Sequence, residues 1–264
     1  VGWNALLLKA GVDAAMAFSD EALLNDILVR AEGLKMKISL SGEKIIHSFS
    51  ERQSKDVVQT EGFLDDYATL IEAWIRIYEA TFEEQWLWQA ERWTSTVLTG
   101  FQQPESGLFY YTSDRAEALI ARKIDLQDNV IPSGNAVMAH NLVKLARLLE
   151  KPEWESMATR MVKAVLPLVL QSTPWYARWA RVLQLLQQPA TELVLTGPDL
   201  HRMKTAVHRL FYPDLLLAGS AVESTLPILT NRVVQMENLV YVCRNKSCQL
   251  PVSDIAQALP LLNV

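Results

Sequence analysis

The 264-residue sequence has only two cysteines, no long apolar run and no block of basic charge. No apolar run reaches the roughly 18 residues that a membrane span requires, so we expect no membrane insertion. The net charge of −5, spread without a basic stripe, argues against a nucleic-acid partner. The phosphate-loop pattern GxGxxG and the catalytic signatures GxSxG and HExxH do not occur. With no basic segment typical of a secretory signal at its start, the sequence predicts a cytoplasmic protein. Since these motifs are missing, we predict neither a metal site nor a cofactor.

The two cysteines, Cys243 and Cys248, are separated by a short polar segment. On one extended strand they could not bond, whereas a turn over residues 244–247 could bring the sulfur atoms within disulfide range. We expect reduced thiols, because this is the usual state in the cytosol. Redox exchange through the pair stays an alternative, and it would require at least one exposed thiol of low pKa.

The sequence is rich in hydrophobic residues, which make up 50% of the chain and follow a helical period as far as about Gln188. The predicted helices form three pairs, 3–19 with 20–35, 62–81 with 83–100, and 133–150 with 152–170, followed by one helix over 174–188. The pairs recur every 60 to 70 residues or so, and each joins an apolar helix end to a second helix through a short acidic turn. This arrangement favours part of an (α/α)6-type toroid, in which alternate helices line the inside.

After Gln188 the pattern changes to that of a small α/β unit. Strands are predicted over 192–196, 214–218 and 238–243, and an amphipathic helix over 199–211. We therefore predict a mainly α protein in two parts. Residues 1–190 form the helical-hairpin part of the toroid, and residues 191–264 form the small α/β C-terminal unit.

Three polar residues lie near helix N-termini on faces that are otherwise apolar: Asn4, Asp66 and Asn135. An ionised carboxylate in such a position costs several kcal/mol unless it is paired, hydrogen-bonded or solvated. If the leading helices run parallel, the three N-termini meet at one mouth, where free N–H groups create positive potential. The alternative is that each residue satisfies only a local helix end.

We predict Asp66 as the catalytic residue at this mouth. The predicted substrate-binding residues are Trp3, Asn4, Tyr67, Ser133, Gly134 and Asn135. Asp65, adjacent to Asp66 in the helix, points about 100° away and is expected at the surface. His140 falls on a polar helix face and is expected to be solvated.

Four segments together resemble a known family: WNALL at Trp3, GFLDDYATLIEAW at Gly62, IPSGNAVMAHNLVKLAR at Ile131, and YVCRNKSCQLPVSD near the C-terminal end. They are similar to the YyaL-like, thioredoxin-domain-containing family over nearly the whole chain. The resemblance implies an α/α toroid similar to six-hairpin glycosidases and N-acylglucosamine 2-epimerase. It also implies that the N-terminal thioredoxin-like domain and the first hairpins of a longer parent protein are partners of this chain.

The resemblance carries no catalytic assignment, and the chain departs from the family pattern in two places. Asn129 replaces a glycine before the PSGN loop, and His140 replaces a small or apolar residue. The pair of inward histidines on which the similar epimerases rely is not evident in the sequence.

Two main functions remain open at this stage. The first is a carbohydrate-binding or carbohydrate-processing toroid with Asp66 at its mouth, for which Glu61, Asp125 or Asp128 would supply the second carboxylate of a glycosidase. The second is a non-catalytic scaffold or binding module for the thioredoxin-like domain. An open mouth favours the enzyme, and a filled one favours the scaffold. Because absent hairpins would leave apolar helix faces exposed, we also expect the chain to self-associate.

Overall fold

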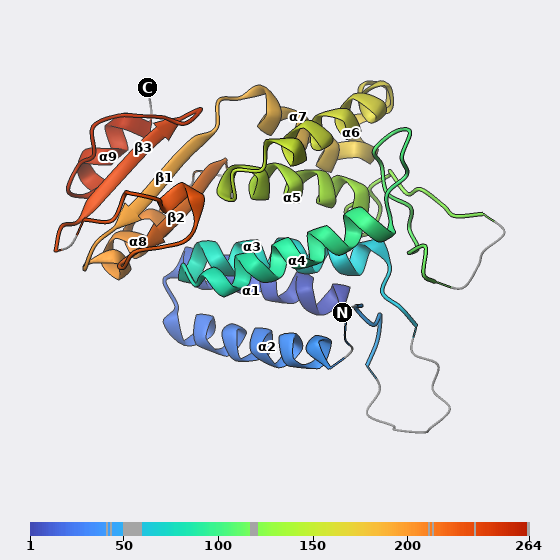
Figure 1. The fold of residues 1–264 in the computed structure, drawn as a ribbon, viewed down its shortest axis with the longest axis horizontal. Helices are drawn as coiled ribbons and strands as arrows, with labels where there is room; N and C mark the ends of the chain where they lie inside the picture. The colour runs from blue at the N-terminus through green and yellow to red at the C-terminus, as the bar shows by residue number, and fades with distance from the viewer. Residues whose placement is uncertain are drawn as a thin grey trace.

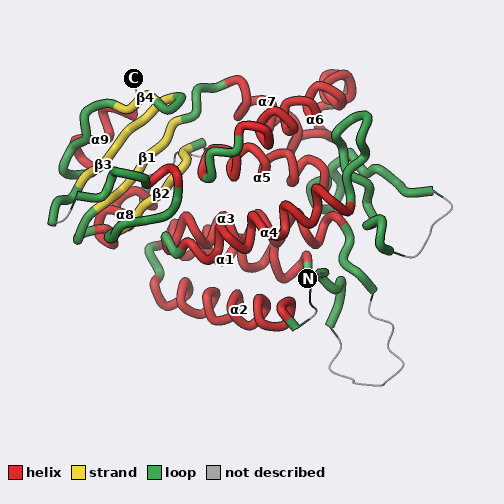
Figure 2. Tube along the Cα trace, viewed as in Figure 1, coloured by secondary structure: helices red, strands yellow, loops and turns green. Residues whose placement is uncertain are grey.

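The computed structural model describes residues 1–40, 42, 44–49, 60–116, 121–210, 212, 214–234 and 236–262. Within these residues the protein is mainly helical, and a small four-stranded sheet lies at one end of the helical part (Figures 1 and 2). The predicted fold class, mainly α with a small C-terminal α/β unit, is confirmed at this level. None of the helices described combines the length and the apolar character of a membrane span.

The helices are α1 (Gly2–Phe18), α2 (Glu21–Ser39), α3 (Leu64–Thr81), α4 (Glu84–Gly100), α5 (Gly134–Leu148), α6 (Pro152–Gln171), α7 (Ala177–Gln187), α8 (Leu200–His208) and α9 (Ile255–Leu262). Two short 3-10 turns are η1 (Thr173–Tyr176) and η2 (Pro227–Leu229), and the strands are β1 (Thr191–Thr196), β2 (Leu215–Ser220), β3 (Leu239–Arg244) and β4 (Ser247–Cys248). Each predicted helix and strand is present, whereas the prediction omitted α9 and β4.

The six longest helices form three hairpins, α1 with α2, α3 with α4, and α5 with α6. Helices α1 and α5 both pack against α3 and run parallel to it. The start of α1 meets the start of α3 where the N–H of Gly2 reaches Asp66, and Arg76 meets Asp13 further along both helices. The start of α5 likewise lies against the start of α3, and Lys144 meets Glu79 further along. The parallel arrangement required for a shared mouth is therefore present.

Helix α3 lies at the centre of the core. Most of its residues are buried, including polar ones, because α1, α4 and α5 all pack against it. Its Trp74 packs against Trp86 of α4, with ring centroids 4.9 Å apart. Large aromatic rings of this kind fill the space between neighbouring helices.

The C-terminal sheet has the strand order β2-β1-β3-β4. Strands β1 and β2 are parallel and are connected through α8, as a parallel pair requires a crossover. Strand β3 pairs antiparallel with β1 and continues into β4 through a tight hairpin.

The sheet packs directly against the ends of the helical hairpins. A Cβ on Gly219 of β2 would lie 2.8 Å from a ring carbon of Phe82, so glycine permits this close approach. Arg181 of α7 pairs with Asp214 just before β2 at 2.5 Å. The two parts therefore share an interface of apolar and ionic contacts.

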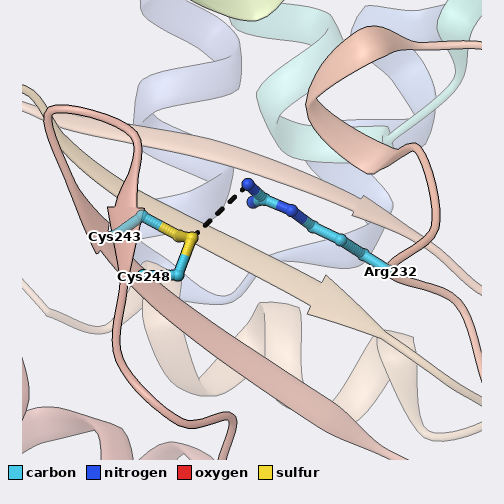
Figure 3. Close-up of a disulfide and its surroundings, with 3 residues drawn as sticks. All are labelled: Arg232, Cys243 and Cys248. Carbon is cyan, nitrogen blue, oxygen red and sulfur yellow. Dashed lines mark hydrogen bonds between the residues drawn. A yellow bond between two sulfur atoms is a disulfide. The ribbon is translucent and has the colours of Figure 1, made fainter.

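Cys243 and Cys248 form a disulfide in this structure, so the expectation of reduced thiols is wrong here (Figure 3). They occupy directly opposite positions on β3 and β4. The turn between them contains Asn245 and Lys246, with φ angles of 48° and 67°. Two consecutive positive φ angles characterise the type I′ hairpin turn, which brings the flanking residues face to face.

Candidate functional site

Asp66 is buried at the start of α3 and accepts hydrogen bonds from three sides. Its Oδ1 accepts the N–H of Gly2 at 2.7 Å. Its Oδ2 accepts the N–H of Phe63 at 3.0 Å and lies 2.8 Å from Nδ1 of His47. The carboxylate thus joins the starts of α1 and α3 to the segment before α3, which explains how its charge is accommodated on a buried face.

The polar residues at the start of α5 hold a loop in the same way. The buried amide of Asn135 accepts the N–H of Phe109 at 2.7 Å and donates to the carbonyls of Phe109 and Asp125. The hydroxyl of Ser133 caps α5 and donates to the carbonyl of Asp125 at 3.0 Å. The predicted mouth is therefore crossed by loop segments that these side chains fix to the helix ends.

The remaining predicted residues divide into a buried and an exposed group. Tyr67 is fully buried, and its hydroxyl accepts the N–H of Ile45 at 3.0 Å. Trp3 is 84% exposed, and Asn4 is also exposed rather than on an inward face. The placement of Asn4 beside Asp66 is thus corrected, because the end of α1 reaches Asp66 through the backbone of Gly2.

Asp65 is partly buried, contrary to the expected surface position. Burial, together with the nearby charges of Asp125 and Asp66, raises its pKa to about 6, although the N–H of Gly134 donates to it. A Cβ at position 134 would lie 2.3 Å from Oδ1 of Asp65, so only glycine permits this approach. Asp65 is therefore a carboxyl group in this region that changes protonation near pH 6.

Aromatic rings line the same region. The ring of Phe63 stacks on Tyr111 with centroids 4.9 Å apart and contacts His47 at 5.0 Å. Burial and the charges of Asp65 and Asp66 raise the pKa of Tyr111 to about 12, so its hydroxyl stays protonated.

Of the carboxylates considered as a second acid, Asp128 accepts the backbone N–H groups of Ser133 and Arg178.

A second candidate site is a cavity of about 440 Å³ between the parallel helices and the C-terminal unit. We call it the charged cavity. Its wall includes Lys9 and Asp13 of α1, Glu72, Arg76 and Glu79 of α3, His140, Asn141 and Lys144 of α5, Arg178 and Arg181 of α7, and His208, Tyr212 and Leu215 of the C-terminal unit. The polar faces of α1, α3 and α5, including the face of His140 that was expected to be solvated, therefore meet around one space.

Ion pairs cross this cavity wall from helix to helix. Arg76 of α3 contacts Asp13 of α1 at 2.5 Å and Glu79 at 3.0 Å. Lys144 of α5 contacts Glu79 at 2.6 Å. Although burial opposes ionisation of Glu79, Lys144 and Arg76 hold its pKa below the usual value. Glu79 therefore stays charged and links α3 to α5.

Two histidines line the charged cavity, and burial lowers the pKa of both. For His140, burial and the cations Arg178 and Lys144 hold the pKa well below its usual value. For His208, burial and the charges of Arg76 and Lys204 lower the pKa to about 4. His140 is thus not the solvated residue expected, and two neutral imidazoles line this cavity.

Several polar atoms of the wall have no hydrogen-bond partner within the described residues. They are Nδ1 of His140, Oδ1 of Asn141 and Nε of Arg178, each inaccessible to solvent. Buried polar atoms are almost always hydrogen-bonded, so three unpartnered ones on residues that line one cavity make it a candidate ligand site. A comparison of the polar sectors of the three leading helices is the sequence signal that could have identified this site.

Comparison with known proteins gives distant relatives. No model of a known protein family matches the chain. It is 27% identical to mouse and 25% identical to human spermatogenesis-associated protein 20, over 99% of this chain and 35% of each relative. It is 24% identical to uncharacterized protein B0495.5 of Caenorhabditis elegans, over 78% of this chain and 29% of that protein. These similarities support a relationship to spermatogenesis-associated protein 20, of whose length the chain spans about a third.

Proposed function

We propose that the charged cavity binds a small anionic molecule rich in hydroxyl groups, such as a sugar acid or a sugar phosphate. The unpartnered atoms of His140, Asn141 and Arg178 carry this proposal. They offer both hydrogen-bond donors and an acceptor, as recognition of a hydroxylated ligand requires. The volume of about 440 Å³ lies within the usual range for small-molecule sites.

The charge of the wall favours an anion. Lys9, Arg76 and Lys144 surround only two carboxylates, Asp13 and Glu79, so this part of the wall has an excess positive charge. Arg178 pairs with Glu72 at 2.5 Å and still has its Nε unpartnered. Guanidinium groups bind carboxylate and phosphate oxygens through two parallel hydrogen bonds, which makes Arg178 the principal anchor in this proposal.

The toroid belongs to the same proposal. Parallel leading helices whose polar sectors face one space suit an α/α toroid that presents a ligand site at its interior. Residues 1–190 would form its hairpin part, and residues 191–264 would form a unit that closes the cavity through His208. A cytoplasmic protein that binds or processes a carbohydrate fits this arrangement, while a scaffold serving a thioredoxin-like domain is the alternative.

Ligand binding should stabilise the chain, and the effect should depend on Arg178. We expect glucose 6-phosphate or glucuronate, but not glucose, to raise the melting temperature. A ligand at 100 times its dissociation constant adds about 2.7 kcal/mol. Because a charged hydrogen bond is worth about 1.5 to 3 kcal/mol, Arg178→Gln should weaken binding at least about tenfold in calorimetry.

Matched variants make this test decisive. Arg178→Lys should retain part of the affinity, and the exposed Arg202→Gln should retain all of it. An anion effect of equal size in Arg178→Gln would contradict the proposal. A sugar effect lost in folded Asp66→Asn and kept in Arg178→Gln would place the ligand at the helix N-termini instead. No effect with any of these ligands would favour the scaffold.

The hairpin α1–α2 presents an apolar face that we propose as the contact surface for further hairpins of a parent protein or for a second copy of the chain. Trp3, Phe18, Val29, Met36 and Leu40 are each at least 66% exposed. On α2 the spacing from Val29 to Met36 to Leu40 places the three side chains on one helix face. Exposed apolar groups gathered in this way usually mark an interaction surface.

We therefore expect the isolated chain to self-associate at micromolar concentration, as measured by light scattering. The double substitution Val29→Ser and Met36→Ser should shift the chain toward monomer, because it removes apolar area from this face. The control Val222→Ser replaces a similarly exposed residue, 69% exposed, outside the hairpin and should have no effect. A wild-type chain that stays monomeric would refute this expectation.

A further inference from the structure

The β3–β4 hairpin presents its disulfide asymmetrically. Cys243 is fully buried, whereas Cys248 is exposed. The turn is held in place because Asn245 exchanges two hydrogen bonds of 3.1 Å with the backbone of Ala190. The exposure of Cys248 therefore favours attack at its sulfur, because access decides which sulfur is attacked in thiol–disulfide exchange.

A guanidinium group lies against the exposed sulfur. Nη2 of Arg232 is 3.5 Å from Sγ of Cys248 (Figure 3). The backbone of Arg232 is fixed, since its carbonyl accepts hydrogen bonds from Thr196 at 3.1 Å and Tyr241 at 2.9 Å. Its guanidinium also lies over the Tyr241 ring, 5.6 Å from the centroid. A fixed cation beside a cysteine favours the thiolate, which is the reactive form.

A carboxyl-bearing residue lies opposite the buried cysteine. Glu192 of β1 is directly opposite Cys243 in the antiparallel register, so both side chains project from the same face of the sheet. Glu192 is itself buried. Burial raises its pKa, while Arg232, Lys246 and Arg147 oppose the rise and Glu150 adds to it. The position of Glu192 opposite Cys243 suits it to pass a proton to a leaving sulfur.

We propose that Cys243 and Cys248 form a thiol–disulfide exchange site that accepts two electrons from a dithiol. One thiolate of the dithiol attacks Sγ of Cys248, the Cys243–Cys248 bond breaks, and the sulfur of Cys243 leaves and takes a proton from Glu192. The second thiolate of the dithiol then attacks the mixed disulfide and releases Cys248 as a thiolate beside Arg232. The dithiol becomes a disulfide, and the hairpin becomes a dithiol.

Arg232 is a positioning residue in this scheme, and a pH profile tests it. The folded chain is reduced with dithiothreitol, and alkylation of Cys248 by iodoacetamide is followed by mass spectrometry between pH 5 and 10. We expect Arg232→Gln to raise the midpoint of the alkylation profile by about one pH unit. Alkylation at neutral pH then slows about tenfold, because the reactive fraction is the thiolate. Arg232→Lys should restore most of the rate, and Arg202→Gln should leave the profile unchanged.

A second experiment tests the role of Glu192. It measures the rate at which dithiothreitol reduces the disulfide in the folded protein. Glu192→Gln should slow opening at pH 6 more than at pH 8, since it removes the proton donor. A disulfide that dithiothreitol opens only upon unfolding would identify a structural cross-link and overturn the proposal. So would an alkylation midpoint that is identical in the wild type and in folded Arg232→Gln.

Discussion

Replacing Glu79 with alanine should destabilise the protein by about 4 kcal/mol, the largest effect we expect from a single substitution. The Glu79 carboxylate is almost completely buried and contacts both Arg76 and Lys144. Its removal leaves two largely buried cations facing each other across α3 and α5 without the anion between them. Breaking a buried ion pair in this way typically costs about 3 to 5 kcal/mol. Urea denaturation at pH 7 measures the loss.

An exposed ion pair provides the control for Glu79. Asp26 pairs with Arg30 on α2, and both side chains are more than half exposed. Asp26→Ala should therefore cost about 0.5 kcal/mol or less.

Because the pKa of Glu79 is lowered in the folded state, its contribution to the free energy of unfolding is present above its unfolded pKa of 4.5. This contribution declines as the pH falls below that value. A difference in unfolding free energy between the wild type and Glu79→Ala that stays constant down to pH 3 would contradict this account.

Replacing Asp66 with alanine should cost about 3 kcal/mol, the second largest effect. The substitution removes the acceptor of the Gly2 and Phe63 N–H groups and of His47. Buried donors left without a partner cost about 1 to 3 kcal/mol each, and some of this is recovered if water enters. Urea denaturation of the variant and the wild type at pH 7 gives the difference.

Asp20 provides the comparison for Asp66 because it caps α2 at an exposed site, where its side chain accepts the N–H of Leu23 at 2.9 Å. Asp20→Ala should cost about 1 kcal/mol. A loss in Asp66→Ala no larger than that in Asp20→Ala would show that the carboxylate does not hold the helix starts together. An unchanged melting temperature with lost ligand binding would instead support a role of Asp66 in a ligand site.

The helical part of the fold could be predicted in detail because its signals are local. Helix α2 begins after the cap Asp20, α5 begins after the cap Ser133, and Pro152 begins α6. These residues set helix ends whatever surrounds them. By contrast, β4 has only two residues and α9 only eight, so neither is long enough to show a clear periodic pattern in the sequence.

The site could be predicted only in part. A helical wheel separates polar from apolar faces, and on α3 it places Glu72, Arg76 and Glu79 in one polar sector. It cannot show whether a polar face meets water or the polar faces of other helices. The pairing of Glu79 with Lys144, which are 65 residues apart, exists only in the folded chain. For this reason the charged cavity was missed, while the clustering of helix N-termini around Asp66 was anticipated.

The bonding of the two hairpin cysteines could not be predicted from the sequence either, although they are close together in the chain. The sequence leaves both the reduced pair and the disulfide open, because the outcome depends on backbone angles at Asn245 and Lys246. Asparagine tolerates a positive φ and lysine does so less readily, so the turn type was not evident from the residues.

The contact between Phe82 and Gly219 has a consequence for how the molecule unfolds. A ring of the helical part that lies directly on the sheet backbone cannot separate from it without exposing apolar surface on both sides. The salt bridge between Arg181 and Asp214 adds a second link across the same boundary. Slowly exchanging amide protons of β1 and of α3 should therefore report one shared opening event, and neither part would behave as a foldon of its own.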